Sequence, residues 1–157
     1  MPATIRRATP DDAEQIARII DEVVAEPDPV AFDRPWTAAE VRSWMERQGE
    51  NGAMFVVDDG RHVLAFAAMD FDSSRPEECT FGAWVRERNR RQGHGTALAE
   101  EALAFARQRG YKRIRARLPE RNEPALSFLS SIGALVPLMN PGTAFVLPIY
   151  QDGEERQ

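Results

Sequence analysis

The stretch from Val85 to Thr96 constrains the fold of this chain more than any other. An apolar strand pattern ends at Val85, an arginine-rich loop follows, and a helical pattern begins at Gly93 and Gly95. Glycine lets the backbone approach a ligand closely, and the first amides of a helix have no partner within it. Such amides bind anions, and neighbouring arginines add positive charge and fork-shaped donors. A phosphate or pyrophosphate is therefore the ligand that this junction favours.

The spacing of these glycines excludes two common phosphate-binding motifs. No Gly-Lys-Ser/Thr follows the loop, so it is not the P-loop of a nucleotide hydrolase. The three-glycine dinucleotide fingerprint needs another small residue where Leu98 stands. The loop also follows three strand patterns, whereas that fingerprint opens a β-α-β unit.

The distribution of charge supports a local anion site. The 157 residues carry a net charge of −5, but Arg86 to Arg121 holds eleven basic residues and four acidic ones, a local charge of +7. The rest of the chain therefore carries −12. A nucleic-acid-binding surface is disfavoured, because the whole chain is acidic and no aromatic residues alternate with the arginines to stack bases.

Several other classes of protein are disfavoured by composition. The single cysteine, Cys79, excludes an internal disulfide framework, and with two histidines far apart we expect no metal site. No apolar run approaches the ~20 residues of a membrane helix, and the N-terminal residues lack the apolar core of a secretory signal. We therefore expect a cytoplasmic protein with no membrane partner.

Hydrophobic periodicity predicts a mixed α/β domain. The predicted helices begin at Pro10, after Thr37, at Gly93 and at Asn122, and the third ends at Arg109. The predicted strands are Thr4–Ala8, Ala53–Val57, His62–Met69, Glu78–Val85, Lys112–Leu118, a segment near Ala134–Leu138, and Ala144–Tyr150. The order is β-α-α-β-β-β-α-β-α-β-β, which makes residues 1–150 a single domain and leaves 151–157 as a polar tail expected to fray.

The spacing Arg90-x-x-Gly93-x-Gly95 resembles the Arg/Gln-x-x-Gly-x-Gly/Ala motif of the Gcn5-related N-acetyltransferases. The resemblance extends along the chain, because Val85 ends a strand five residues before the motif. Asn122, Ala125 and Gly133 also fall where that family has an Asn-x-x-Ala helix and its end. The order of elements is the order of the family's fold.

The resemblance implies a binding site for acetyl-coenzyme A (acetyl-CoA) or a longer acyl-CoA. The backbone from Arg91 to Thr96 would hold the pyrophosphate, and the strand end would pair with the pantetheine arm. The residues implied in coenzyme binding are Trp84, Val85, Arg90, Arg91, Gln92, Gly93, His94, Gly95, Thr96, Asn122, Ala125 and Phe128.

The implied activity is direct transfer of an acetyl group to an amine of a small molecule or peptide. Members of the family often place a tyrosine, the acid for the departing thiolate, where this chain has Leu129. Water or another residue would then supply that proton, with Ser130 as the candidate. The alternative is a module that binds or senses acyl-CoA without catalysis. Family members often dimerise, so a homodimer is also expected.

Candidate residues for the rest of the reaction follow from their positions. Glu78 begins the strand on which the family often carries its base, whereas Cys79 suits a small buried side chain better than a nucleophile. Arg115 and Arg117 either bind an acidic group of the acceptor or pair with acidic residues of the chain. Trp36 and Trp44 either pack in the core or wall an acceptor pocket.

Overall fold

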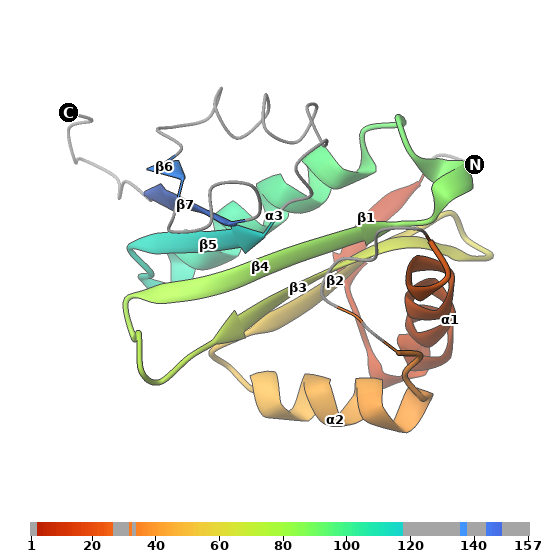
Figure 1. The fold of residues 1–157 in the computed structure, drawn as a ribbon, viewed down its shortest axis with the longest axis horizontal. Helices are drawn as coiled ribbons and strands as arrows, with labels where there is room; N and C mark the ends of the chain where they lie inside the picture. The colour runs from red at the N-terminus through yellow and green to blue at the C-terminus, as the bar shows by residue number, and fades with distance from the viewer. Residues whose placement is uncertain (1–2, 27–31, 33, 118–135, 138–143, 149–157) are drawn as a thin grey trace.

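The computed structural model describes residues 3–26, 32, 34–117, 136–137 and 144–148. A seven-stranded sheet crosses the molecule in the order β1-β2-β3-β4-β5-β7-β6 (Figure 1). Its strands are β1 (Thr4–Arg7), β2 (Ala53–Asp58), β3 (Val63–Phe71), β4 (Glu78–Val85), β5 (Arg113–Arg117), β6 (Val136–Pro137) and β7 (Ala144–Pro148). The β4–β5 pair is parallel, and the other described pairs are antiparallel.

Helices cover both faces of the sheet (Figure 1). On one face lie α1 (Ala13–Val24), preceded by the short 3-10 helix η1 (Pro10–Asp12), and α2 (Ala38–Gln48). On the other face lies α3 (His94–Arg109), which follows the 3-10 helix η2 (Glu87–Asn89). Because strand side chains alternate between faces, the sheet supplies apolar residues to two separate cores.

Local sequence signals explain where the helices begin and end. Thr37 Oγ1 accepts a hydrogen bond from Glu40 N at 3.1 Å, and Glu40 Oε1 accepts one from Thr37 N at 3.2 Å, which completes the predicted capping box of α2. Helix α3 ends at Gly110, whose φ of 81° is the left-handed conformation that glycine adopts without strain.

The predicted mixed α/β class is confirmed, and β4 has the predicted bounds. The first helix differs at its start, because residues 10–12 form a tighter 3-10 turn before α1 begins. The helix expected from Asn122 and the tail 151–157 lie outside the described residues. Among the described helices, none is long and apolar enough to cross a membrane.

Candidate active site

Strand β4 loses one of its two partners halfway along its length. It pairs with β3 from Cys79 to Val85, but with β5 only from Glu78 to Phe81. Within the described part of the chain, residues 82–85 therefore have no strand beside them on the β5 side. An open strand edge of this kind can accept an extended ligand through main-chain hydrogen bonds.

The loop after β4 presents a row of backbone amides with no acceptor. Ala97 N donates to Gly93 O at 3.0 Å, as the first hydrogen bond at the start of α3. The N–H groups of residues 91–96 donate to no atom of the described residues. These amides lie at the positive end of a 16-residue helix, so they are suited to bind an anion.

The conformation of this loop leaves space for a ligand next to the backbone. Arg91 has a φ of 64° and Gly93 a φ of 85°, so the chain turns sharply twice before α3. A Cβ atom on Gly93 or Gly95 would meet no atom of the described residues within 4 Å. The described residues leave room beside the backbone at residue 95, so a ligand can approach the chain closely here. This geometry fits a pyrophosphate.

Two arginines of the basic loop are bound to the end of α1 and the residues just after it. Arg86 is buried, donates from Nε to Val63 O at 2.9 Å, and forms an ion pair with Glu22. Arg90 donates from Nε to Val85 O at 3.0 Å and binds both carboxylate oxygens of Glu26, at 2.6 and 2.8 Å. The hydrogen bonds that Arg90 donates to Glu26 raise the pKa of Arg90. We call the two ion pairs, Arg86–Glu22 and Arg90–Glu26, the arginine clamp.

The clamp changes the interpretation of the positive charge in the loop. Arg90 was expected to bind the coenzyme, but its guanidinium is already held by Glu26 and the backbone. Arg88 and Arg91 are exposed, and neither has a carboxylate within 4.0 Å in the described structure. His94 lies 3.0 Å from Gln92, ring nitrogen to side-chain oxygen. The positive charge open to a phosphate is therefore that of Arg88 and Arg91.

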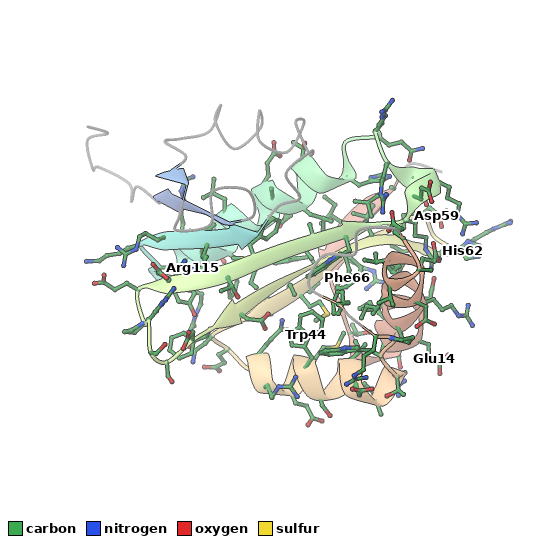
Figure 2. The ribbon with its side chains drawn as sticks, viewed as in Figure 1. Glu14, Trp44, Asp59, His62, Phe66 and Arg115 are labelled. Carbon is green, nitrogen blue, oxygen red and sulfur yellow. The ribbon has the colours of Figure 1, made fainter. Side chains whose placement is uncertain are left out.

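Aromatic rings gather on the α1–α2 face beside the open half of β4. Trp84 stacks on Phe66 with ring centroids 4.9 Å apart, and its ring covers Gly82 so closely that a Cβ there would lie 2.3 Å from it. The rings of this aromatic cluster, each within 6.4 Å of another, belong to Phe32, Trp36, Trp44, Phe66 and Trp84. Figure 2 shows Trp44 between α2 and the sheet.

Glu78, the expected base, is surrounded by arginines. Arg113 Nε donates to its Oε1 at 3.2 Å, and Arg115 Nη2 lies 3.2 Å from its Oε2. Burial raises the pKa of Glu78, but the hydrogen bonds and charges of the two arginines outweigh it, and the net pKa is lowered. Glu78 also lies four residues, or about 13 Å, from the open half of β4. These contacts favour a structural ion pair over proton transfer.

The remaining expected residues fall into two groups. Arg115 lies on β5 at the end of the sheet away from α1 (Figure 2), and Glu78 is its ion-pair partner. The side chain of Arg117 lies outside the described residues, as do Asn122, Ala125, Phe128 and Ser130. Within the described part of the chain, no cluster of three His, Cys, Asp or Glu residues could hold a metal ion.

Cys79 is buried, with 1% of its surface exposed. Burial raises the pKa of its thiol to about 12, so the nucleophilic thiolate is absent at neutral pH. The interpretation of Cys79 as a small core residue is the one that this environment supports.

The sequence analysis did not single out Asp70, a half-buried carboxylate near the end of β3. Its Oδ1 accepts hydrogen bonds from Trp44 Nε1 at 2.8 Å and from Gln48 Nε2 at 3.2 Å. The available signal was an acidic residue in a strand that is otherwise apolar up to Met69. Nothing in the local sequence linked it to α2, because the two donors precede it by 26 and 22 residues.

Comparison with known proteins identifies the family. The acetyltransferase (GNAT) domain model matches residues 3–135, so this chain belongs to the GNAT acetyltransferases. A curated relative, YwnH of Bacillus subtilis (strain 168), is provisionally named a phosphinothricin acetyltransferase. It is 25% identical over 145 residues, which cover 90% of this chain and 89% of YwnH.

Solved structures share the fold at lower identity. A GNAT superfamily phosphinothricin acetyltransferase from Sinorhizobium meliloti, in complex with AcCoA, matches with a TM-score of 0.81 and 21% identity, covering 100% of this chain and 94% of that one. The yncA protein of Salmonella typhimurium, with its cofactor acetyl-CoA, matches with a TM-score of 0.80 and 20% identity, covering 97% and 96%.

Proposed function

We propose that this protein is an acetyl-CoA-dependent N-acetyltransferase that moves an acetyl group directly to an amine. The backbone amides of residues 91–96 bind the pyrophosphate, with Arg88 and Arg91 adding charge. The open edge of β4, residues 82–85, pairs with the pantetheine arm. The observation that carries the proposal is the row of unpaired amides at the start of α3 directly after this open edge.

The family relatives support the choice of ligand and acceptor. The Sinorhizobium meliloti and Salmonella typhimurium proteins were solved with acetyl-CoA. YwnH and the Sinorhizobium meliloti protein are named for phosphinothricin, which favours a small-molecule amine over a peptide as the acceptor.

Several residues keep a proposed role. Asn122, Ala125 and Phe128 line the far end of the pantetheine arm, and Ser130 is the acid for the thiolate. Arg117 is the proposed partner of an acidic substituent where the acceptor carries one. We give Glu78 no proton-transfer role, because two arginines occupy its carboxylate oxygens and lower its pKa, which makes it a weak base. A homodimer is part of the proposal, and light scattering of the purified protein tests it.

Replacement of Gly95 tests the pyrophosphate site. Alanine suits the first turn of a helix better than glycine, and its Cβ would contact no atom of the described part of the chain. Gly95→Ala should therefore keep the stability or raise it by up to ~1 kcal/mol. The family motif accepts alanine at this position, but the branched side chain of Gly95→Val stands where the phosphate must approach. We expect the Kd for coenzyme A, measured by calorimetry, to rise about tenfold or more in Gly95→Val.

The matched control is Ala104→Val, an exposed position in the middle of the same helix. It carries the same cost of a β-branched residue in a helix without touching the loop. Coenzyme affinity in Gly95→Val equal to that of the control would rule out this pyrophosphate site. Tight coenzyme binding without thiol release across a broad panel of amines would instead favour the acyl-CoA-sensing module.

A further inference from the structure

We propose that Asp70 and the half-buried rings of Trp36, Trp44 and Trp84 form the acceptor site, and that the acceptor is a primary amine with an apolar, ring-sized body. The proposal rests on the acetyltransferase function proposed above and names the substrate class of that same site. In this site Asp70 binds the ammonium group, and the three tryptophans contact the body of the acceptor.

The carboxylate of Asp70 has one oxygen that is still open to a ligand. Both of its described donors, Trp44 Nε1 and Gln48 Nε2, bind Oδ1, and Oδ2 has no hydrogen-bond donor among the described residues. Asp70 is half-buried, and both donors are neutral. In the described structure no Lys, Arg or His nitrogen lies within 4.0 Å of it, in contrast to Glu78 and its two arginines. A half-buried carboxylate without a cation is a suitable partner for an ammonium group.

The register of the sheet places Asp70 next to the open half of β4. Asp70 lies opposite Thr80 on β4, and Ala68 lies opposite Gly82. Thr80 is two residues, or about 7 Å along the strand, from Gly82, where the partnership with β5 has just ended. A coenzyme arm that runs back along β4 from the loop ends in this region. Asp70 is therefore within reach of an amine placed at the end of the arm.

Asp70 and the aromatic cluster share the α1–α2 face of the sheet. Side chains two residues apart on a strand share a face, so Asp70 lies on the side of Phe66 and Ala68, which pack in the core beneath α1 and α2. The Trp44 indole both donates to Asp70 and lies 5.4 Å from Trp36 and 6.4 Å from Trp84, centroid to centroid.

The exposure of these rings suits them to bind a ligand. Phe32 and Phe66 are buried, whereas Trp36, Trp44 and Trp84 are half-buried and keep part of their surface for contact. Aromatic faces bind apolar groups, and they attract a neighbouring ammonium through the ring quadrupole. A charged end at Asp70 beside an apolar wall matches an amine with one apolar substituent.

The first test compares two probes in the unaltered protein with coenzyme A bound. 2-Phenylethylamine carries the ammonium and the ring, and 2-phenylethanol carries the ring alone. We expect a saturable change in tryptophan fluorescence, with the amine binding about tenfold or more tightly than the alcohol. Equal affinities, or no saturable binding of the amine, would overturn the proposal without any variant.

The second test replaces Asp70 by asparagine. Asp70→Asn keeps a side-chain oxygen for Trp44 and Gln48 and removes only the charge, so the preference for the amine should fall to less than threefold. Glu46→Gln, which removes an exposed carboxylate from α2, should keep the preference. A preference that survives in Asp70→Asn would assign the ammonium to another group.

The coenzyme measurement separates this proposal from the proposed function. The Kd for coenzyme A should be the same in Asp70→Asn and in the unaltered protein. If the unaltered protein fails to bind coenzyme A, the proposed function fails. If it binds coenzyme A but the amine preference does not depend on Asp70, only the acceptor site proposed here fails.

Discussion

At the scale of single residues, burial decides which reactive groups can take part in chemistry. Cys79 faces the α3 side of the sheet and is covered almost completely. Asp70 lies on the other face, and its Oδ2 has no hydrogen-bond donor among the described residues. Cys79 on β4 and Asp70 on β3 lie on neighbouring strands, but their environments differ. Cys79 packs as a small apolar side chain, and Asp70 remains available to a ligand.

The thiol of Cys79 should react with an alkylating reagent only when the protein unfolds. Burial raises its pKa to about 12, from 9.0 in the unfolded chain, so at pH 8 the folded protein should not react with iodoacetamide. Between pH 9 and pH 12 the unfolded chain loses this proton and the folded protein keeps it, so stability falls as pH rises through that range. Mass spectrometry after alkylation, with and without denaturant, measures the difference. Rapid alkylation of the native protein at pH 8 would contradict this burial.

At the scale of elements, the arginine clamp joins the phosphate-binding loop to α1. Glu22 and Glu26 are four residues apart, as are Arg86 and Arg90. Glu22 forms an ion pair with Arg86, and Glu26 forms one with Arg90. Both arginines donate as well to carbonyl groups of the sheet, Val63 O and Val85 O. The clamp holds the loop in place before any ligand arrives, which lowers the entropy lost on binding.

The clamp predicts that adjacent arginines differ in their effect on coenzyme binding. Arg91 has no carboxylate partner in the described structure, whereas Arg90 is bound by Glu26. We expect Arg91→Gln to weaken coenzyme A binding about fivefold or more at low salt, and Arg90→Gln by less than about threefold. Calorimetry at two salt concentrations measures both variants. A larger loss in Arg90→Gln would mean that Arg90 leaves Glu26 for the phosphate.

The bond between Arg90 and Glu26 can be measured by itself. A double-mutant cycle of Arg90→Gln and Glu26→Gln should give a coupling free energy of unfolding of up to ~1 kcal/mol, as expected for a partly exposed pair. Glu14→Gln, at an exposed position on α1, is the control and should show no coupling to Arg90→Gln. Coupling near zero for Glu26 would remove it from the clamp.

At the scale of the whole molecule, Arg6 ties the edge of the sheet to the first helix. Its guanidinium binds both oxygens of Asp12 at 2.9 Å and Asp58 Oδ2 at 3.0 Å, so it joins β1, η1 and β2. Asp12 is buried, and it also accepts a hydrogen bond from Thr9 N at 2.8 Å. The bond from Arg6, more than any other influence, lowers the pKa of Asp12.

This ion pair predicts how stability changes in acid. Because the folded pKa of Asp12 lies below its ordinary value of 3.8, Asp12 stabilises the fold above that pH and the contribution is lost as pH falls further. Asp12→Asn should reduce the free energy of unfolding by about 1–2 kcal/mol at pH 7, and the difference should shrink below pH 4. Urea unfolding at several pH values measures it, with Asp11→Asn as an exposed control. A difference that does not change with pH would exclude the ion pair as its cause.

Much of the fold was readable from local patterns. The bounds of β4, the capping box at Thr37 and the end of α3 at Gly110 depend on residues a few positions apart, and all three predictions are confirmed. The loop between β4 and α3 was predicted as an anion site for the same reason. Its glycines and the unpaired amides at the helix start are consecutive in the chain.

The roles of individual charged side chains were not readable in this way. Glu26 lies 64 residues from Arg90, Glu78 lies 37 from Arg115, and Asp70 lies 26 from Trp44. A charge acts through its nearest partners in space, and distant partners meet only when strands pair and helices pack. The sequence by itself determined the mixed α/β fold and the glycine loop, because periodicity and turn chemistry act locally. Only the tertiary structure decided that Arg90 and Glu78 are already paired and that Asp70 has no cation beside it in the described part of the chain, because such pairings form between distant elements.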